Sequence, residues 1–296
     1  MLVPDLSLIR ITTLEDCRKN PFIPLGVSHF QKEPYNLYYI NAHHGFGIDH
    51  PSFRTAQKAI DFFKPEAIVI ERRNDEVGHS AQMAEENKSD GFKKITEAEY
   101  TAYLAKQRNI PLIGAEPEES VIFKDLTHRG FSAKELVYKK VLGNIVYGKG
   151  NNEICGVSVD DFSKACVNWF SEIYSDYPIA LSFKEMKEWF LQQHAGYNSL
   201  FDIKSDDLAP SLSNNATRIQ AISYYEDVSR EQSIVPTISN ALNQHKMVLV
   251  VYGAAHLESE RAVFIKMLGQ PTFKPMVPVA LPFSMHPKIH TCLSMK

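Results

Sequence analysis

The chain has 296 residues, of which 44% are hydrophobic and 23% are charged, a composition typical of a globular protein with a sizeable core. Its formal net charge of −3, with no block of lysine or arginine, argues against a nucleic-acid partner, because binding phosphates requires a basic surface. The four cysteines are scattered without a C-x-x-C pair, which argues against a zinc ribbon and against a dense disulfide framework.

The N-terminus lacks the pattern of a classical secretory signal. Pro4 and Asp5 stand where such a signal would need a basic segment followed by an unbroken apolar run. The longest apolar run, residues 247–255, is far shorter than the roughly 20 residues of a membrane-spanning helix. We therefore predict no membrane span, and a protein that is cytoplasmic or is secreted without a classical signal peptide.

A βαβ unit is the first structure that the sequence predicts. Residues 37–42 (LYYINA) have the aromatic and β-branched composition of a buried strand, and residues 66–70 (EAIVI) have the composition of a second strand. Between them, Asp49 and Pro51 are typical of a helix start. Because a helical crossover joins parallel strands, we expect these two strands to run parallel.

A third strand is predicted at residues 110–115 (IPLIGA), after a further helix. Thr96 and Glu99 have the spacing of a capping box, which predicts the start of that helix. The segment after the third strand has the pattern of amphipathic helices and loops. We expect one α/β domain over residues 1–296, with a helical insertion or cap within it at approximately 120–215.

The C-terminal part returns to the α/β pattern. A long helix is predicted at about 216–244, then a strand at 247–252 (MVLVVY), then a helix that Gly269 closes. Residues 276–283 are apolar but contain two prolines, which predicts an edge strand or an extended packing segment. The whole pattern indicates the α/β class with a mostly parallel sheet.

Ionisable residues follow four of the predicted strands. These residues are His43 and His44, Glu71, Glu116, and His256. In open, mostly parallel sheets the ligand crevice lies outside the carboxyl ends of the strands. A single polar residue at a strand end can simply cap a helix or meet solvent, but four such positions together predict a shared site.

Two kinds of chemistry suit this set of side chains. Two imidazoles with one or two carboxylates could hold a divalent metal such as Mn, Co, Zn or Fe, which would activate a bound water for hydrolysis. Without a metal, one histidine could remove a proton from water while a carboxylate orients its ring. The sequence leaves both alternatives open.

Arg230 is a further candidate, because it lies near an apolar stripe of the long helix. A guanidinium that faces the core keeps its charge and must find acceptors, and Glu71 or Glu116 would serve. The alternative is an exposed i,i+4 pair with Glu226. The stripe consists of Ile219, Ile222, Ile234, Ile238 and Leu242.

The order of these segments resembles the TraB/Tiki superfamily and, more distantly, the erythromycin esterase-like and ChaN-like haem-binding proteins. His44, Glu71, Arg230 and His256 fall where the functional residues of the family would fall. The matching segments are NAHHG at 41–45, KPEAIVIE at 64–71, YLAKQRNIPLIGAE at 103–116, SREQSIVPTISNAL at 229–242 and VLVVYGAAHL at 248–257.

The sequence also departs from the family pattern. Asn41 replaces the glycine of the first G-x-x-H motif, and it also stands where the esterase-type motif has a glutamate. His43 therefore competes with His44 for the role of the first histidine. Asn74, three residues after Glu71, could contact the edge of the site or lie on the surface.

The resemblance implies a central mixed, mostly parallel sheet with helices on both faces. It also implies metal-dependent cleavage of a peptide or amide bond, as in Tiki-like proteins. His44 and His256 would be metal ligands, with Glu71 as a ligand or as the general base. Glu116 would support the site, and Arg230 would stabilise oxyanion charge or fix a carboxylate.

Two other functions remain open at this stage. One is an esterase-like hydrolase that uses a histidine base and no metal. The other is a protein without catalytic activity on the same fold, which would bind haem or another small ligand or act as an interaction protein. The substrate would be a peptide or a small molecule, and the sequence does not indicate an oligomeric state.

Overall fold

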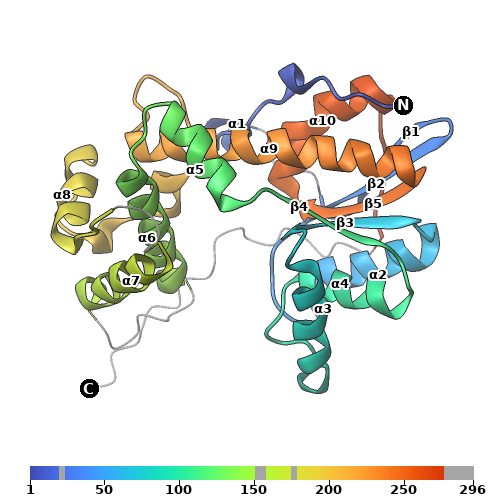
Figure 1. Ribbon diagram of the computed structural model, residues 1–296, viewed down its shortest axis with the longest axis horizontal. Coiled ribbons are helices and arrows are strands. Elements are labelled where there is room, and N and C mark those ends of the chain that lie inside the picture. The colour runs from blue at the N-terminus through green and yellow to red at the C-terminus, as the bar shows by residue number, and fades with distance from the viewer. Residues whose placement is uncertain (20–23, 151–157, 175–178, 277–296) are drawn as a thin grey trace. The chain divides into compact units, whose positions relative to one another are not determined.

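The computed structural model of the protein describes residues 1–19, 24–150, 158–174 and 179–276 (Figure 1). The chain divides into two compact units. Unit 1 contains the described residues of Met1–Thr12, Asp16–Glu119 and Val228–Leu281, and unit 2 contains those of Thr13–Glu15 and Ser120–Asp227. The expectation of one domain with a helical insertion stays a prediction.

Unit 1 is built around a six-stranded sheet in the order β4-β3-β5-β2-β1-β6. Strands β4, β3, β5 and β2 are parallel, whereas β1 pairs antiparallel with β2 and with β6. The predicted α/β fold with a mixed, mostly parallel sheet is therefore confirmed. The strands are β1 (Val27–Lys32), β2 (Tyr35–Ala42), β3 (Ala67–Arg73), β4 (Leu112–Glu116), β5 (Met247–Gly253) and β6 (Thr272–Lys274).

Helices cover both faces of this sheet, as predicted (Figure 1). In β2, Tyr38 and Ile40 belong to the core on one face, whereas Leu37 and Tyr39 belong to the core on the other, because successive side chains of a strand alternate. The first face is covered by α2 (Pro51–Phe63), α3 (Val77–Glu86) and α4 (Glu97–Gln107), and the second by the C-terminal part of α9 (Arg218–Gln244) and by α10 (Ala254–Leu268).

The helix boundaries in unit 1 follow the predicted signals. Pro51 is the first residue of α2, and the preceding residue, His50, accepts a hydrogen bond from the backbone of Ser52. The capping box at the start of α4 is formed, with the Thr96 N–H donating to Glu99 Oε2 at 2.7 Å. These local bonds fix where each helix begins relative to the preceding strand.

Strands β1 and β6 and helix α3 were not predicted. The segment VSHFQK of β1 lacks regular alternation of apolar and polar residues, and β6 has only three residues, all exposed. Both strands form because partners are present, since β1 pairs along its whole length with β2. The predicted extended segment at 276–283 lies outside the described residues from position 277 onward.

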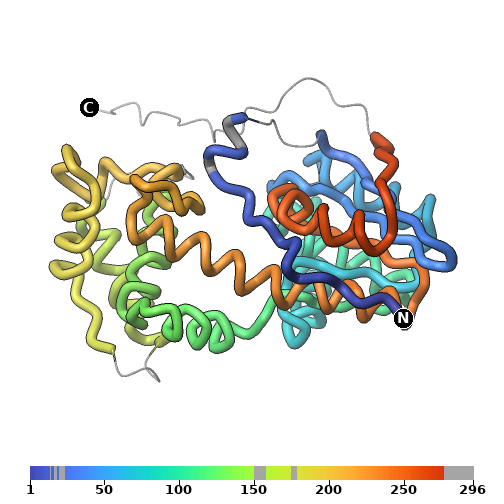
Figure 2. Tube along the Cα trace, turned by 90° about the horizontal axis from the view of Figure 1, so that it is seen from above, coloured from blue at the N-terminus to red at the C-terminus, as the bar shows by residue number. Residues whose placement is uncertain are grey.

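The N-terminal segment packs along α10 and the C-terminal end of α9 (Figure 2). The Arg10 N–H donates to the Ser259 carbonyl at 3.1 Å, and the Leu2 N–H donates to Asn243 Oδ1 at 2.7 Å. These bonds attach the first residues to unit 1. The short elements here are η1 (Leu6–Leu8) and α1 (Leu14–Lys19), and η2 (Lys88–Asp90) follows α3.

Unit 2 is helical, and it corresponds closely to the segment predicted as helical at about 120–215. Its core is a cluster of apolar side chains that includes Leu142, Phe170, Phe190 and Ile222. No helix in the described part of the chain is long and apolar enough to cross a membrane. The elements are α5 (Glu119–His128), α6 (Ala133–Gly150), α7 (Val159–Ile173), α8 (Phe183–Gln193), η3 (Leu200–Asp202), η4 (Ser205–Leu208) and the beginning of α9.

Candidate functional site

The carboxyl ends of four parallel strands bring ionisable side chains together in unit 1. Glu71 lies in β3, and Glu116 is the last residue of β4. His44 follows β2 by two residues, and His256 lies in the first turn of α10, directly after β5. Because β4, β3, β5 and β2 are neighbours in this order, the four positions line one edge of the sheet.

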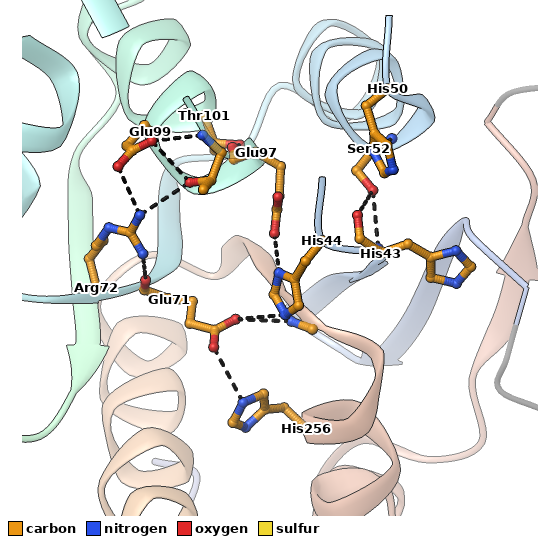
Figure 3. Close-up of polar contacts among 12 residues, drawn as sticks. His43, His44, His50, Ser52, Glu71, Arg72, Glu97, Glu99, Thr101 and His256 are labelled. Atoms are coloured by element: carbon orange, nitrogen blue, oxygen red, sulfur yellow. Dashed lines mark hydrogen bonds and ion pairs between the residues drawn. The ribbon is translucent and has the colours of Figure 1, made fainter. Parts of the chain in front are cut away.

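Glu71 is at the centre of the cluster (Figure 3). Its Oε2 lies 3.7 Å from His44 Nε2, and its Oε1 lies 3.6 Å from His256 Nε2. The backbone N–H of Gly253 also donates to Oε2 at 3.3 Å. Burial disfavours the charged carboxylate, but the two imidazoles and the nearby guanidinium of Arg230 outweigh burial and hold the pKa of Glu71 well below its usual range.

Arg230 of α9 binds two carboxylates of the cluster at once. Its Nε and Nη2 donate to the two oxygens of Glu116 at 2.8 and 2.7 Å, and Nη2 also donates to Glu71 Oε1 at 3.0 Å. The predicted pairing of Arg230 with Glu71 or Glu116 is confirmed, since it binds both. A two-pronged contact of this kind orients the carboxylate as well as neutralising it.

His44 is held by a carboxylate from a different helix. Its Nδ1 lies 2.6 Å from Oε1 of Glu97, the first residue of α4, which is only 3% exposed. The side chain of His44 is itself 62% exposed. The hydrogen bond to Glu97 favours the imidazolium form and raises the pKa of His44.

His256 has the same kind of partner but lies in the interior. Its Nδ1 is 2.7 Å from Oε1 of Glu231, which is 1% exposed. Burial disfavours the imidazolium, but the hydrogen bond and the charge of Glu231 outweigh it and raise the pKa of His256 well above its ordinary value. Glu260 is fully buried, and burial together with the charge of Glu231 raises the pKa of Glu260 well above its usual range.

His43, Asn41 and Asn74 were the additional candidates from the sequence, and each makes a different contact near the cluster. The backbone N–H of His43 donates to Ser52 Oγ at 3.1 Å, and its ring points away from His44 (Figure 3). Asn41 is buried, and its amide donates to the Pro24 carbonyl at 2.6 Å. The exposed Asn74 accepts a hydrogen bond from the Gly114 N–H at 3.3 Å. The structure therefore brings His44, and not His43, to Glu71.

Three side chains among the described residues could hold a divalent cation. Glu71, Glu116 and His256 each offer one ligand atom, and these atoms lie within 4.8 Å of one another. The ligand types suit zinc, manganese or iron. His44, which the sequence suggested as a ligand, is not part of this group, and Arg230 already donates three hydrogen bonds to the two carboxylates. The donor set fits a metal, but a cation would have to share both carboxylates with Arg230.

Glu97 and Glu231 contact the site histidines and were not identified from the sequence. Glu231 precedes Ile234, Ile238 and Leu242 at helical spacing, so it falls on the apolar stripe of α9 and its burial could have been predicted. Glu97 carried only the signal of a helix start. What the sequence does not reveal is which histidine each carboxylate meets.

Gly253 offers a test of how closely His44 approaches the sheet. A Cβ at position 253 would lie 2.7 Å from His44 Nε2, whereas the backbone angles of φ −57° and ψ 145° are allowed for alanine. We expect Gly253→Ala to fold normally and to displace the His44 ring from Glu71, which ring NMR signals of His44 would report. Gly78→Ala is the matched control, because a Cβ there meets nothing within 4 Å. Unchanged His44 signals in Gly253→Ala would contradict this packing.

Comparison of the chain with protein-family models, with curated proteins and with solved structures finds no match in any of the three. The resemblance to the TraB/Tiki superfamily therefore stays a prediction. The roles that it implies for His44, Glu71, Arg230 and His256 stay predictions as well. What is established is the geometry, in which these residues and Glu116 meet at one edge of the sheet.

Proposed function

We propose that this protein is a hydrolase of ester or amide bonds in which His44 is the general base. One observation carries the proposal: the His44 side chain is 62% exposed while its Nδ1 is held by the buried Glu97 at 2.6 Å. An ionised carboxylate only accepts hydrogen bonds, so Nδ1 carries a proton and Nε2 is the nitrogen that can accept one. An exposed imidazole that is oriented through one nitrogen and can accept a proton on the other is the arrangement that general-base catalysis requires.

The reaction needs two proton movements at His44. Nε2 takes a proton from water while the water oxygen adds to the carbonyl carbon of the substrate. The tetrahedral intermediate then loses its alcohol or amine by breaking the C–O or C–N bond, and the leaving group takes the proton from Nε2. Glu97 stabilises the imidazolium that exists between the two movements.

The charges around the site favour a carbonyl substrate over a phosphate ester. Four carboxylates surround the imidazoles, namely Glu71, Glu116, Glu97 and Glu231, whereas Arg230 is the only guanidinium that bonds to any of them among the described residues. A dianionic phosphate would be repelled by this set. A neutral ester or amide would not be.

A divalent-metal hydrolase is the second candidate, and the Glu71, Glu116 and His256 group favours it. A metal held there would act as a Lewis acid and lower the pKa of a bound water. We place it second because Arg230 satisfies both oxygens of Glu116 and one of Glu71 without any metal. Cleavage of a peptide bond, as in the Tiki-like proteins that the chain resembles, would belong to this candidate.

Hydrolysis assays with and without a chelator would separate the two candidates. The panel would contain neutral p-nitrophenyl esters and short blocked peptides, and the metal content of the purified protein would be measured in parallel. We expect hydrolysis that persists after treatment with EDTA. Loss of activity in EDTA with recovery in Mn²⁺, Co²⁺ or Zn²⁺ would favour the metal candidate, and no hydrolysis of the panel with or without these ions would count against both.

The pH dependence of the hydrolysis follows from His44. A general base works in its neutral form, and the hydrogen bond to Glu97 raises the pKa of His44 above the ordinary 6.5 of a histidine. We therefore expect kcat/KM to rise with pH and to reach half of its plateau above pH 6.5. In Glu97→Gln the charge that stabilises the imidazolium is removed, so the midpoint should move to lower pH. A midpoint that does not respond to this substitution would argue that another group is the base.

A further inference from the structure

The two site histidines have the same arrangement with opposite exposure. Each imidazole uses Nδ1 to contact a helix-borne carboxylate, at 2.6 Å for Glu97 and 2.7 Å for Glu231. Each directs Nε2 toward one oxygen of Glu71, at 3.7 Å for His44 and 3.6 Å for His256. Glu71 is therefore flanked by two imidazoles that are held in the same way from behind.

The two carboxylates are enclosed, which makes each hydrogen bond important. The side chains of Glu97 and Glu231 are 4% and 2% exposed. In each of them Oε2 is buried, and Glu231 additionally has the Glu260 carboxyl, whose pKa is raised, as a side-chain neighbour. Burying a carboxylate is costly unless donors compensate it. The imidazole Nδ1–H is a donor to each carboxylate, and the Glu260 carboxyl is a further hydrogen-bond partner of Glu231.

The two imidazole rings differ in their exposure to solvent. The side chain of His44 is 62% exposed, whereas that of His256 is 10% exposed. Water can therefore reach His44, while His256 lies between Glu231 and Glu71 inside the protein. An exposed ring can exchange protons with solvent, as a general base must. A shielded ring is suited to keep a fixed charge.

We propose that Glu97 and Glu231 are positioning residues that fix both imidazoles with the proton on Nδ1 and with Nε2 toward Glu71. Through this arrangement His44 is the imidazole that exchanges its proton with water and substrate, and His256 is a fixed charge partner of Glu71. The catalytic meaning of this division rests on the proposed hydrolase function. The orientation and the protonated nitrogen of each ring do not, because they can be measured without a substrate.

NMR of the protein labelled with ¹⁵N at histidine tests the proposal directly. Correlation of the ring protons with both ring nitrogens distinguishes the Nδ1–H form from the Nε2–H form that imidazole prefers in water. At a pH where its ring is neutral, we expect His44 to show the Nδ1–H form. For His256 we expect a downfield Nδ1–H proton that exchanges slowly with water.

Substitutions at Glu97 and Glu231 test whether these carboxylates determine the protonated nitrogen of each ring. Glu97→Met has a similar side-chain volume but no acceptor, so His44 should change to the Nε2–H form, whereas Glu97→Gln keeps a carbonyl acceptor and should retain the Nδ1–H form. Glu231→Met should remove the slowly exchanging, downfield Nδ1–H signal of His256, whereas Glu231→Gln keeps a carbonyl acceptor and should retain it. Glu66→Met is the control, because Glu66 is an exposed glutamate that precedes β3, at the other end of this strand from Glu71.

An Nε2–H form of His44 in the unchanged protein would overturn the proposal, and so would Met and Gln variants with identical ring signals. If Glu231→Met does not fold, the slow exchange of the His256 Nδ1–H in the unchanged protein still decides the case. Fast exchange there would contradict an enclosed pair. The absence of hydrolysis, by contrast, would remove the proposed function and leave the NMR result intact.

Discussion

Replacing His44 with alanine is expected to lower kcat/KM by about 10²–10⁴-fold, the usual contribution of a general base. The ring is largely exposed and its loss leaves no core cavity, so the protein should remain folded. In the proposed reaction His44 acts on water and does not hold the substrate, and we therefore expect the loss mainly in kcat rather than in KM. Steady-state kinetics on the best substrate of the ester and amide panel would measure it.

Two other histidines provide the controls for this substitution. His79→Ala removes an exposed imidazole on α3 that takes no part in the site contacts described above, and should leave kcat unchanged. His43→Ala removes the competing histidine of the NAHHG segment, whose ring points away from His44, and should have a much smaller effect than His44→Ala (Figure 3). Equal losses in His43→Ala and His44→Ala would mean that the loop as a whole, and not the His44 ring, is required.

Much of the site could be predicted because the relevant signals are local. The strand that ends at Ala42 has a short apolar run and is followed by an ionisable residue. The apolar run of the next strand leads directly to Glu71. Parallel strands place such residues at the same edge of a sheet, so their convergence follows from topology. The pairing of Arg230 with a carboxylate could be predicted because the position of Arg230 on the helix places its guanidinium toward the core.

The rest of the site depends on pairings that the sequence does not encode locally. Glu97 and His44 are 53 residues apart, and the bond between them depends on the packing of α4 against the sheet. Glu231 is 25 residues before His256 and reaches it from a different helix. Strand β1 is a similar case in the fold, since its weak local pattern becomes a strand only through pairing with β2. Long-range contacts therefore decide which histidine receives which carboxylate.

Replacing Arg230 with methionine is expected to destabilise the protein by about 3 kcal/mol, because two largely enclosed carboxylates lose their shared cation. The side chains of Glu71 and Glu116 are 20% and 15% exposed, so water compensates only part of the lost contact. The double variant Arg230→Met/Glu116→Gln removes one of the two charges and should recover part of the loss, which is a non-additive effect. Urea unfolding would measure the free energy of unfolding of each variant.

A surface arginine provides the reference for the Arg230 experiment. Arg54 is exposed on α2, where its Nη2 donates to the Asp49 carbonyl at 3.3 Å. Exposed contacts of this kind contribute little, so Arg54→Met should change stability by less than about 0.5 kcal/mol. An equally small effect of Arg230→Met would show that the carboxylates do not need the guanidinium.

The effect of added Zn²⁺ or Mn²⁺ on the free energy of unfolding is a second measurement on the same variants. If Arg230 occupies the place where a cation would bind, either ion should stabilise Arg230→Met more than the unchanged protein, since binding to the folded state raises its stability.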